Sequence, residues 1–143
     1  MSESTWKVIG ASGFVGSSIV ARLHAEGISV DPIEAPRLAT RALDADSLID
    51  EADRLEGIID TLAEAFAGAQ VVVIAAGLAA PNMQELPPLV GANALLPAVI
   101  AIAAQRTGVR RVIHLSSAAV QGPRQVLDAS EETAPFSAYS FSK

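Results

Sequence analysis

The sequence has no cysteine, only two histidines and few aromatic side chains, which make up 4% of its 143 residues. Without cysteine it can form neither a disulfide framework nor a thiolate metal site. His24 and His114 have no neighbours at metal-ligand spacing, so we expect no metal and read both histidines as structural. Basic residues are also scarce. The formal net charge of −6 argues against nucleic acid or an anionic membrane as the main partner.

The N-terminal residues lack the basic and apolar regions of a signal peptide, so we expect a cytoplasmic protein. The most apolar stretch, 86–104, contains Pro87, Pro88 and Pro97, which favours a buried helix over a membrane span. Half of the residues are hydrophobic, with much alanine and valine. This composition suits one domain built from a parallel sheet covered by helices.

Three glycines at a spacing of three, Gly10, Gly13 and Gly16, connect an apolar run to an amphipathic segment. The run 6–9 is typical of a strand, and 17–26 is typical of a helix that ends near Gly27. The first turn of a helix has unpaired N–H groups and the positive end of the helix dipole, and glycines let a pyrophosphate approach the backbone. The motif therefore predicts a dinucleotide site. The alternative is a tight strand–helix turn without a ligand.

Three further segments read as strands: 28–33, where Pro32 indicates a strand end or an edge strand, 71–74 and 111–115. Segment 37–67 shows no clear strand and resembles an irregular insert with two helical stretches. The alternation of strands and helices predicts an α/β fold with a Rossmann-type doubly wound parallel sheet, truncated after the fifth strand.

Glu34 follows the second predicted strand, 18 residues after Gly16, where a dinucleotide fold places the acid that holds the adenosine ribose. A carboxylate there favours NAD and repels the 2′-phosphate of NADP. Arg37 and Arg41 keep NADP possible, because guanidinium groups bind phosphate well. The alternative is that all three are solvated loop charges.

Residues 89–106 predict a long helix that is apolar on every side from Ala94 to Ala104. One face should pack on the sheet, and the other indicates a second subunit or a missing part of the chain. Pro97 cannot donate a backbone hydrogen bond to the Asn93 carbonyl, so we expect a kink there.

Tyr139 and Lys143 lie four residues apart, which places them on one face of a helix. A lysine ammonium beside a phenol stabilises the phenolate, so this pair could move a proton, with Ser117 holding a substrate oxygen. Such an arrangement suits hydride transfer at a hydroxyl or keto carbon. By spacing alone, a surface tyrosine and a solvated lysine would explain the pattern as well.

The order of these motifs resembles the extended short-chain dehydrogenase/reductases, the NAD-dependent epimerase/dehydratase family. Segment 10–16 looks like the nucleotide fingerprint of that family, 91–93 like its helix motif, and 114–122 like its S-S-x-x-V-Y-G segment with Gln121 in place of tyrosine. The resemblance implies Ser117, Tyr139, Lys143 and Asn93 as catalytic residues. It implies that the cofactor, NAD or NADP, is bound by Gly10, Gly13, Phe14, Val15, Gly16, Glu34, Arg37, Ala75, Ala76, Gly77, Asn93, Ser116, Tyr139 and Lys143.

The resemblance also implies a small-molecule substrate, which could be a nucleotide sugar, and a homodimer paired through the apolar helix and the one after it. Members of the family continue for about as long again. We therefore expect residues 1–143 to be the NAD(P)-binding domain alone, inactive without the C-terminal substrate domain. A dinucleotide-binding regulatory module without catalysis, or a scaffold whose glycine turn binds nothing, would share most of these features.

Overall fold

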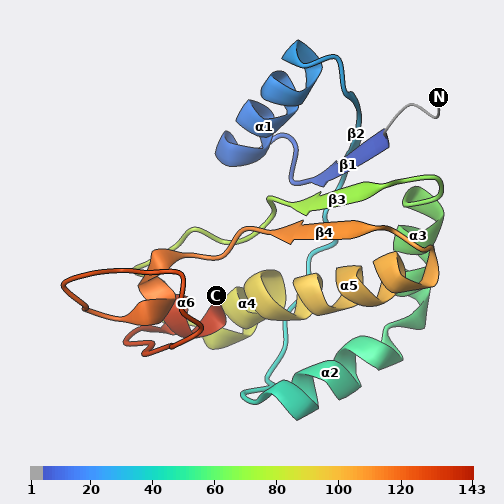
Figure 1. Cartoon of the computed structure of the whole chain (residues 1–143). Helices are drawn as coiled ribbons and strands as arrows, with labels where there is room; N and C mark the ends of the chain where they lie inside the picture. The colour runs from blue at the N-terminus through green and yellow to red at the C-terminus, as the bar shows by residue number, and fades with distance from the viewer. Residues whose placement is uncertain (1–4) are drawn as a thin grey trace.

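The computed structural model describes residues 5–143. It contains a parallel sheet whose strands run in the order β2-β1-β3-β4 (Figure 1). The strands are β1 (Thr5–Ile9), β2 (Ser29–Ile33), β3 (Val71–Ile74) and β4 (Arg111–His114). The helices are α1 (Phe14–Ala25), α2 (Ala45–Arg54), α3 (Glu56–Ala65), α4 (Leu86–Val90), α5 (Leu96–Arg106) and α6 (Ala138–Ser142), with a π-helical segment η1 (Gly91–Leu95) and a 3₁₀ segment η2 (Ala118–Gln121).

Helices cover both faces of the sheet, so the doubly wound α/β class is confirmed (Figure 1). On one face, Val8 and Val73 pack against Leu23 of α1. On the other face, Ile9 and Val72 belong to a larger core formed with α2, α3 and α5. The alternation of neighbouring strand residues between the two cores is the period-2 pattern of a strand buried on both sides.

The described residues form four strands, so the expected count of five is corrected. In the classic doubly wound order 3-2-1-4-5-6, the missing strand is the one outside β2. Here the chain after β2 does not pair with it. Instead it crosses to the helical layer, where the N–H of Thr40 donates to the carbonyl of Pro87 at 3.1 Å. Pro36 also removes one donor from a possible ladder. Pro32 lies in β2, which is the edge strand, as predicted.

The predicted long apolar helix is present, and it begins earlier, at Leu86. The expected kink appears as the π-helical turn η1, in which the N–H of Leu96 donates to the carbonyl of Gly91, five residues back. Segment Leu86–Arg106 is long and apolar enough to cross a membrane by length and composition, but half of its most apolar window is buried inside the protein. Core helices of soluble proteins have the same property.

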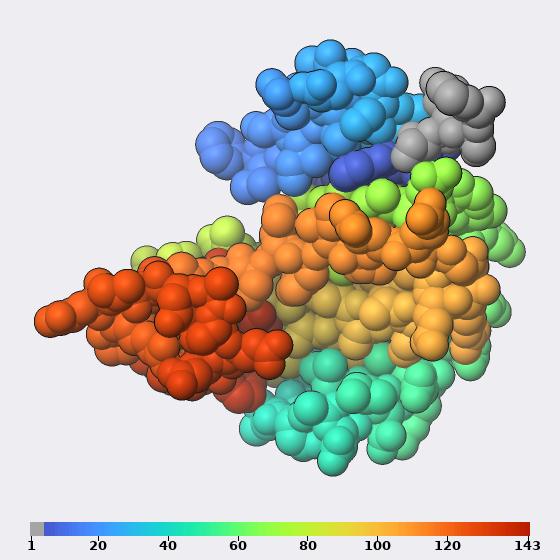
Figure 2. All heavy atoms as spheres, in the orientation of Figure 1, coloured from blue at the N-terminus to red at the C-terminus, as the bar shows by residue number. Residues whose placement is uncertain are grey.

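Figure 2 shows that the C-terminal part of the chain protrudes from the body of the molecule. The protruding part is η2 and the loop that follows it, whereas α6 packs back against α4. Gln121 closes the loop, because its side-chain amide donates to the carbonyls of Asp128 at 2.9 Å and Ser130 at 3.2 Å. At the base of the loop, Ser137 and Ser140 form a reciprocal capping box that starts α6.

Candidate active site

The turn between β1 and α1 is built so that only glycine fits at two of its positions. Gly10 has φ of +82°, and a Cβ there would lie 2.6 Å from the amide nitrogen of Ala76. A Cβ on Gly16 would lie 2.0 Å from the carbonyl oxygen of Gly10. The turn therefore packs directly on the backbone that leaves β3, which a side chain on Gly10 would push away, and a side chain on Gly16 would open the turn itself.

Gly13 is the N-cap of α1 and offers no side-chain oxygen to the first turn of the helix. The first turn also lacks acidic residues. The amides of Phe14, Val15 and Gly16 consequently have neither a helical partner nor a capping side chain. Phe14 and Val15 expose 94% and 48% of their surface. The amides and the positive end of the helix dipole together form an anion-binding position.

A cavity of about 650 Å³ opens beside this turn, at the carboxyl ends of the strands. It is lined by Gly10, Ser12, Gly13, Ala35, Pro36, Arg37, Leu38, Ala75, Ala76, Gly77, Leu78, Pro88, Ala92 and Leu96. Six of the predicted cofactor residues therefore surround one space: Gly10, Gly13, Arg37, Ala75, Ala76 and Gly77. The small side chains of Ala75 and Ala76, and Gly77 without one, leave room for the cavity after β3.

Glu34 lies outside this cavity. It lines an adjoining hollow of about 480 Å³ next to α3, and Arg37 lines both spaces. Glu34 and Arg37 are both exposed, so each is free to face a ligand that extends from one hollow to the other. Arg41 is exposed and lines neither.

Asn93 is buried in η1, where its side chain bridges two segments. Its Oδ1 accepts a hydrogen bond from the N–H of Leu78 at 2.8 Å, and its Nδ2 donates to the Leu78 carbonyl at 3.1 Å and to the Ser142 hydroxyl at 3.0 Å. Gly77 lies next to the Asn93 side chain: a Cβ added to Gly77 would lie 2.7 Å from Asn93 Oδ1 and 3.5 Å from Lys143 Nζ. The structure thus brings Asn93, Gly77 and Lys143 together.

α6 carries Tyr139, Lys143 is its C-cap, and the helix packs against α4 and η2. Tyr139 and Lys143 are partly buried. The Lys143 ammonium donates to the Leu115 carbonyl at 3.2 Å, and the Ser116 hydroxyl donates to the Lys143 carbonyl at 3.1 Å. Ser117 caps η2, because its hydroxyl accepts from the N–H of Ala119 at 3.2 Å. The end of β4 and the end of α6 therefore meet at one place.

Burial lowers the pKa of Lys143 below its usual value. Burial also lowers the pKa of His114, and the Lys143 ammonium lowers it further. His114 is therefore neutral at pH 7 and adds no second positive charge beside Lys143. Within residues 5–143, no group of three or more His, Cys, Asp and Glu side chains could hold a metal ion.

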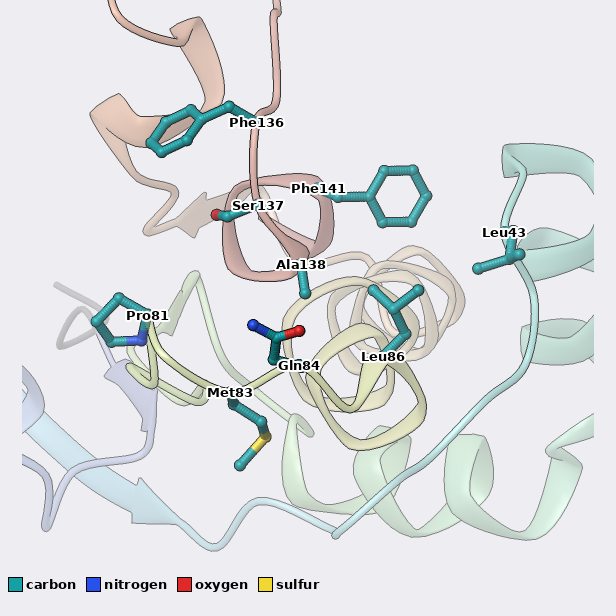
Figure 3. A pocket seen from close by; sticks show the side chains of 9 residues that line it. All are labelled: Leu43, Pro81, Met83, Gln84, Leu86, Phe136, Ser137, Ala138 and Phe141. Atoms are coloured by element: carbon teal, nitrogen blue, oxygen red, sulfur yellow. The ribbon is translucent and has the colours of Figure 1, made fainter.

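A further hollow of about 700 Å³ lies on another side of α6 (Figure 3). The side chains that surround it are mostly apolar: Leu43, Pro81, Met83, Gln84, Leu86, Phe136, Ser137, Ala138 and Phe141. Tyr139 is not among them. The helix therefore separates this apolar hollow from the face that carries Tyr139 and Lys143.

Sequence reasoning missed the contacts of Leu78 and Ser142. Leu78 has no polar side chain, and it takes part through its backbone. Ser142 directly precedes the predicted lysine, but its partner Asn93 is 49 residues away in the sequence. No local pattern connects two residues at that distance.

The glycine turn, the uncapped helix and the cavity at the carboxyl ends of parallel strands define a Rossmann-type nucleotide-binding domain. The model of the NAD dependent epimerase/dehydratase family matches residues 6–143. The chain therefore belongs to this family, and the resemblance noted from its motifs is confirmed. No curated protein matches the chain by sequence.

Solved structures agree with the fold. MoeE5 in complex with UDP-glucose and NAD is 24% identical with a TM-score of 0.73, over 97% of this chain and 45% of that one. Uronate dehydrogenase from Agrobacterium tumefaciens is 19% identical with a TM-score of 0.70, over 99% and 52%. A mutant of UDP-glucuronic acid 4-epimerase from Bacillus cereus, in complex with a fluorinated UDP-glucuronic acid and NAD, is 19% identical with a TM-score of 0.69, over 97% and 48%. The chain thus spans about half the length of these proteins.

Proposed function

We propose that this chain is the NAD-binding part of an epimerase, dehydratase or oxidoreductase of the extended short-chain type. The observation that carries the proposal is the close packing of the turn from Gly10 to Gly16, which we call the glycine cradle. The backbone packs closely at Gly10 and Gly16, and Gly10 and Gly13, the N-cap of α1, line the cavity of about 650 Å³. Without a ligand these exposed amides would bond only water, and a diphosphate there would replace that water with charge-assisted hydrogen bonds.

The diphosphate of the dinucleotide would lie against the amides of Phe14, Val15 and Gly16. The ribose hydroxyls of the adenosine would reach Glu34, whose carboxylate accepts two hydrogen bonds and repels a 2′-phosphate. We therefore propose NAD as the cofactor, with Arg37 as the residue that would let NADP bind more weakly. When bound, the nicotinamide supplies the acceptor or donor of a hydride.

The residues of this chain would move the proton that accompanies the hydride. Tyr139 would take the proton from a substrate hydroxyl, or return it to a keto oxygen, and Lys143 would stabilise the phenolate. Ser117 would hold the same substrate oxygen. Ser116 and Asn93 would hold the backbone around this pair in place, because Ser116 bonds the Lys143 carbonyl and Asn93 bonds Leu78 and Ser142.

The substrate would be a small molecule with a hydroxyl at the reacting carbon, and a nucleotide sugar is our specific proposal. MoeE5 was solved with UDP-glucose and with UDP-glucuronic acid, which supports this substrate class. The net charge of −6 gives no support to nucleic acid as a partner.

We also propose a homodimer that pairs through the helical layer of α4, η1 and α6. Phe141 and Leu43 expose 44% and 59% of their surface at the hollow shown in Figure 3. Phe141 also borders a second apolar hollow lined by Leu48, Val90 and Ala94. Phe141→Asp should shift the molar mass measured by light scattering from dimer to monomer, and an unchanged mass would contradict the interface.

The test of the reaction is Tyr139→Phe, which removes one hydroxyl. General acid–base catalysis contributes about 10²–10⁴-fold, so turnover by the protein that carries the substrate domain, followed as product formation, should fall by at least about 100-fold while the Kd for NAD stays within a few-fold. Unchanged turnover would remove Tyr139 from the mechanism. Tight NAD binding without turnover of any hydroxyl substrate would favour the alternative of a silent dinucleotide-binding module. Absence of NAD binding would leave only a scaffold.

A further inference from the structure

The C-terminal turn of α6 contains a buried serine that none of the assigned roles explains. Ser142 is almost fully buried, whereas its neighbour Phe141 exposes 44% of its surface. Its hydroxyl donates to the carbonyl of Tyr139 at 2.8 Å and accepts from Asn93 Nδ2 at 3.0 Å. Both hydrogen bonds are short enough to fix the orientation of the hydroxyl.

These bonds matter because α6 has only five residues. A helix of one and a half turns is not stable by itself in water, so contacts with the rest of the protein must hold it. The capping box of Ser137 and Ser140 holds its first turn. Ser142 holds its last turn, where the Tyr139 carbonyl would otherwise have no helical partner.

Asn93 connects this serine to the dinucleotide cavity. Its amide forms a two-bond bridge with the backbone of Leu78, a residue that lines the cavity. Both protons of Nδ2 are used, one by the Leu78 carbonyl and one by Ser142. The Asn93 side chain therefore has no donor left for a substrate, and it acts on the site through its two neighbours.

We infer that Ser142 is a positioning residue that, through Asn93, locks the helix carrying Tyr139 and Lys143 to the Leu78 wall of the dinucleotide cavity. The inference rests on the proposed function for its catalytic consequence, while the lock itself is a property of the free protein. A change in the wall at Leu78 is transmitted to α6 by three consecutive side-chain hydrogen bonds. Gly77 is part of this device, since any side chain there would strike Asn93 Oδ1.

The test compares Ser142→Ala with Ser142→Thr, which keeps the hydroxyl, and with Thr107→Val. Thr107 is the matched control because its partly buried hydroxyl bonds the Ala103 and Ala104 carbonyls at the C-terminal end of α5, away from the lock. The first measurement is amide hydrogen exchange in the free protein. Ser142→Ala should speed the exchange of the Leu78 amide and of α6, and Ser142→Thr should restore it. Thr107→Val should change neither. Unchanged exchange at Leu78 in Ser142→Ala would overturn the lock.

The second measurement is turnover with NAD. It is made on the protein that carries the substrate domain. Ser142→Ala removes two hydrogen bonds, each worth about 1 kcal/mol, so kcat should fall about fivefold to thirtyfold, with KM for NAD within about twofold. Equal kcat would show that the lock does not serve catalysis. If the wild-type protein binds no NAD, the proposed function fails, and the exchange of Leu78 still decides the lock.

Discussion

Replacing Gly10 by alanine tests the cradle, and three glycines in this chain separate the causes of its effect. Gly57 lies in α3 with ordinary backbone angles and open space around it. Gly27 also has open space, but its φ is +72°. Gly10 has φ of +82°, and a Cβ added there would lie 2.6–2.9 Å from backbone atoms. Gly57→Ala should stabilise the protein by up to about 1 kcal/mol through helix propensity. Gly27→Ala should cost about 1–2 kcal/mol, the penalty for a side chain in the left-handed region.

Gly10→Ala carries the same conformational penalty and adds a clash with Ala75 and Ala76. Forcing an extra methyl group into a packed position costs about 1–3 kcal/mol more, so Gly10→Ala should lower the free energy of unfolding by about 2–5 kcal/mol in total. The clash displaces the backbone of Ala75 and Ala76, which lines the cavity together with Gly10, so the affinity for NAD should fall much more than in Gly27→Ala. Urea unfolding measures the stability and NAD titration measures the affinity. If Gly10→Ala were no less stable than Gly27→Ala and bound NAD equally, the proposal that the glycine turn binds the dinucleotide would be contradicted.

Three further predictions concern charges. Burial favours the neutral amine of Lys143, so its pKa in a carbon-detected NMR titration should lie below the ordinary lysine value of 10.5. The free energy of unfolding should then rise as pH rises from that lowered pKa towards 10.5. A midpoint at or above 10.5 would contradict this. Arg106 donates two hydrogen bonds of 2.8 and 3.0 Å to Glu56, and they lower the pKa of Glu56. The stability that they add is present above pH 4.5 and is lost as pH falls through the lowered pKa. Arg106→Met should therefore weaken the loss of stability in acid, and an unchanged loss would count against the ion pair. Asp31→Asn should cost about 1 kcal/mol because it leaves the buried Lys7 ammonium without its carboxylate at 2.5 Å, whereas Asp50→Asn on the exposed face of α2 should cost nothing measurable in urea unfolding.

The sequence predicts the elements that follow from local rules. Apolar runs such as 71–74 were assigned to strands and are strands, because a segment buried on both faces needs no partner residue to be recognised. The glycine turn was also predictable, since its spacing places Gly10 at the strand end and Gly13 at the helix N-cap. Pro32 indicated an edge strand for a reason that is equally local.

The sequence predicts no clear strand in 37–67, and the structure has none there, but the path that the chain takes instead could not be predicted with the same rules. Whether a chain segment joins a sheet depends on what else its backbone can bond. Here Thr40 bonds Pro87, and the backbone of Leu38 and Ala39 runs so close to Gly91 that a Cβ there would lie 2.1 Å from the Leu38 carbonyl oxygen. These partners are about fifty residues away, so they are invisible to any pattern of neighbouring residues.

The π-helical turn shows how a local and a distant constraint combine at the site. Pro97 made an irregularity in the helix predictable, because its nitrogen cannot complete the regular ladder. Only the structure shows that the irregularity takes the form of a π turn over 91–95, in which Asn93 lies. Within that turn, Asn93 faces the Leu78 backbone and Ser142 together. Asn93 precedes Pro97 by four residues, about one helical turn, so the same turn holds both the irregularity and these contacts. The proline that interrupts the helix and the asparagine that joins the cavity to α6 are therefore parts of one arrangement.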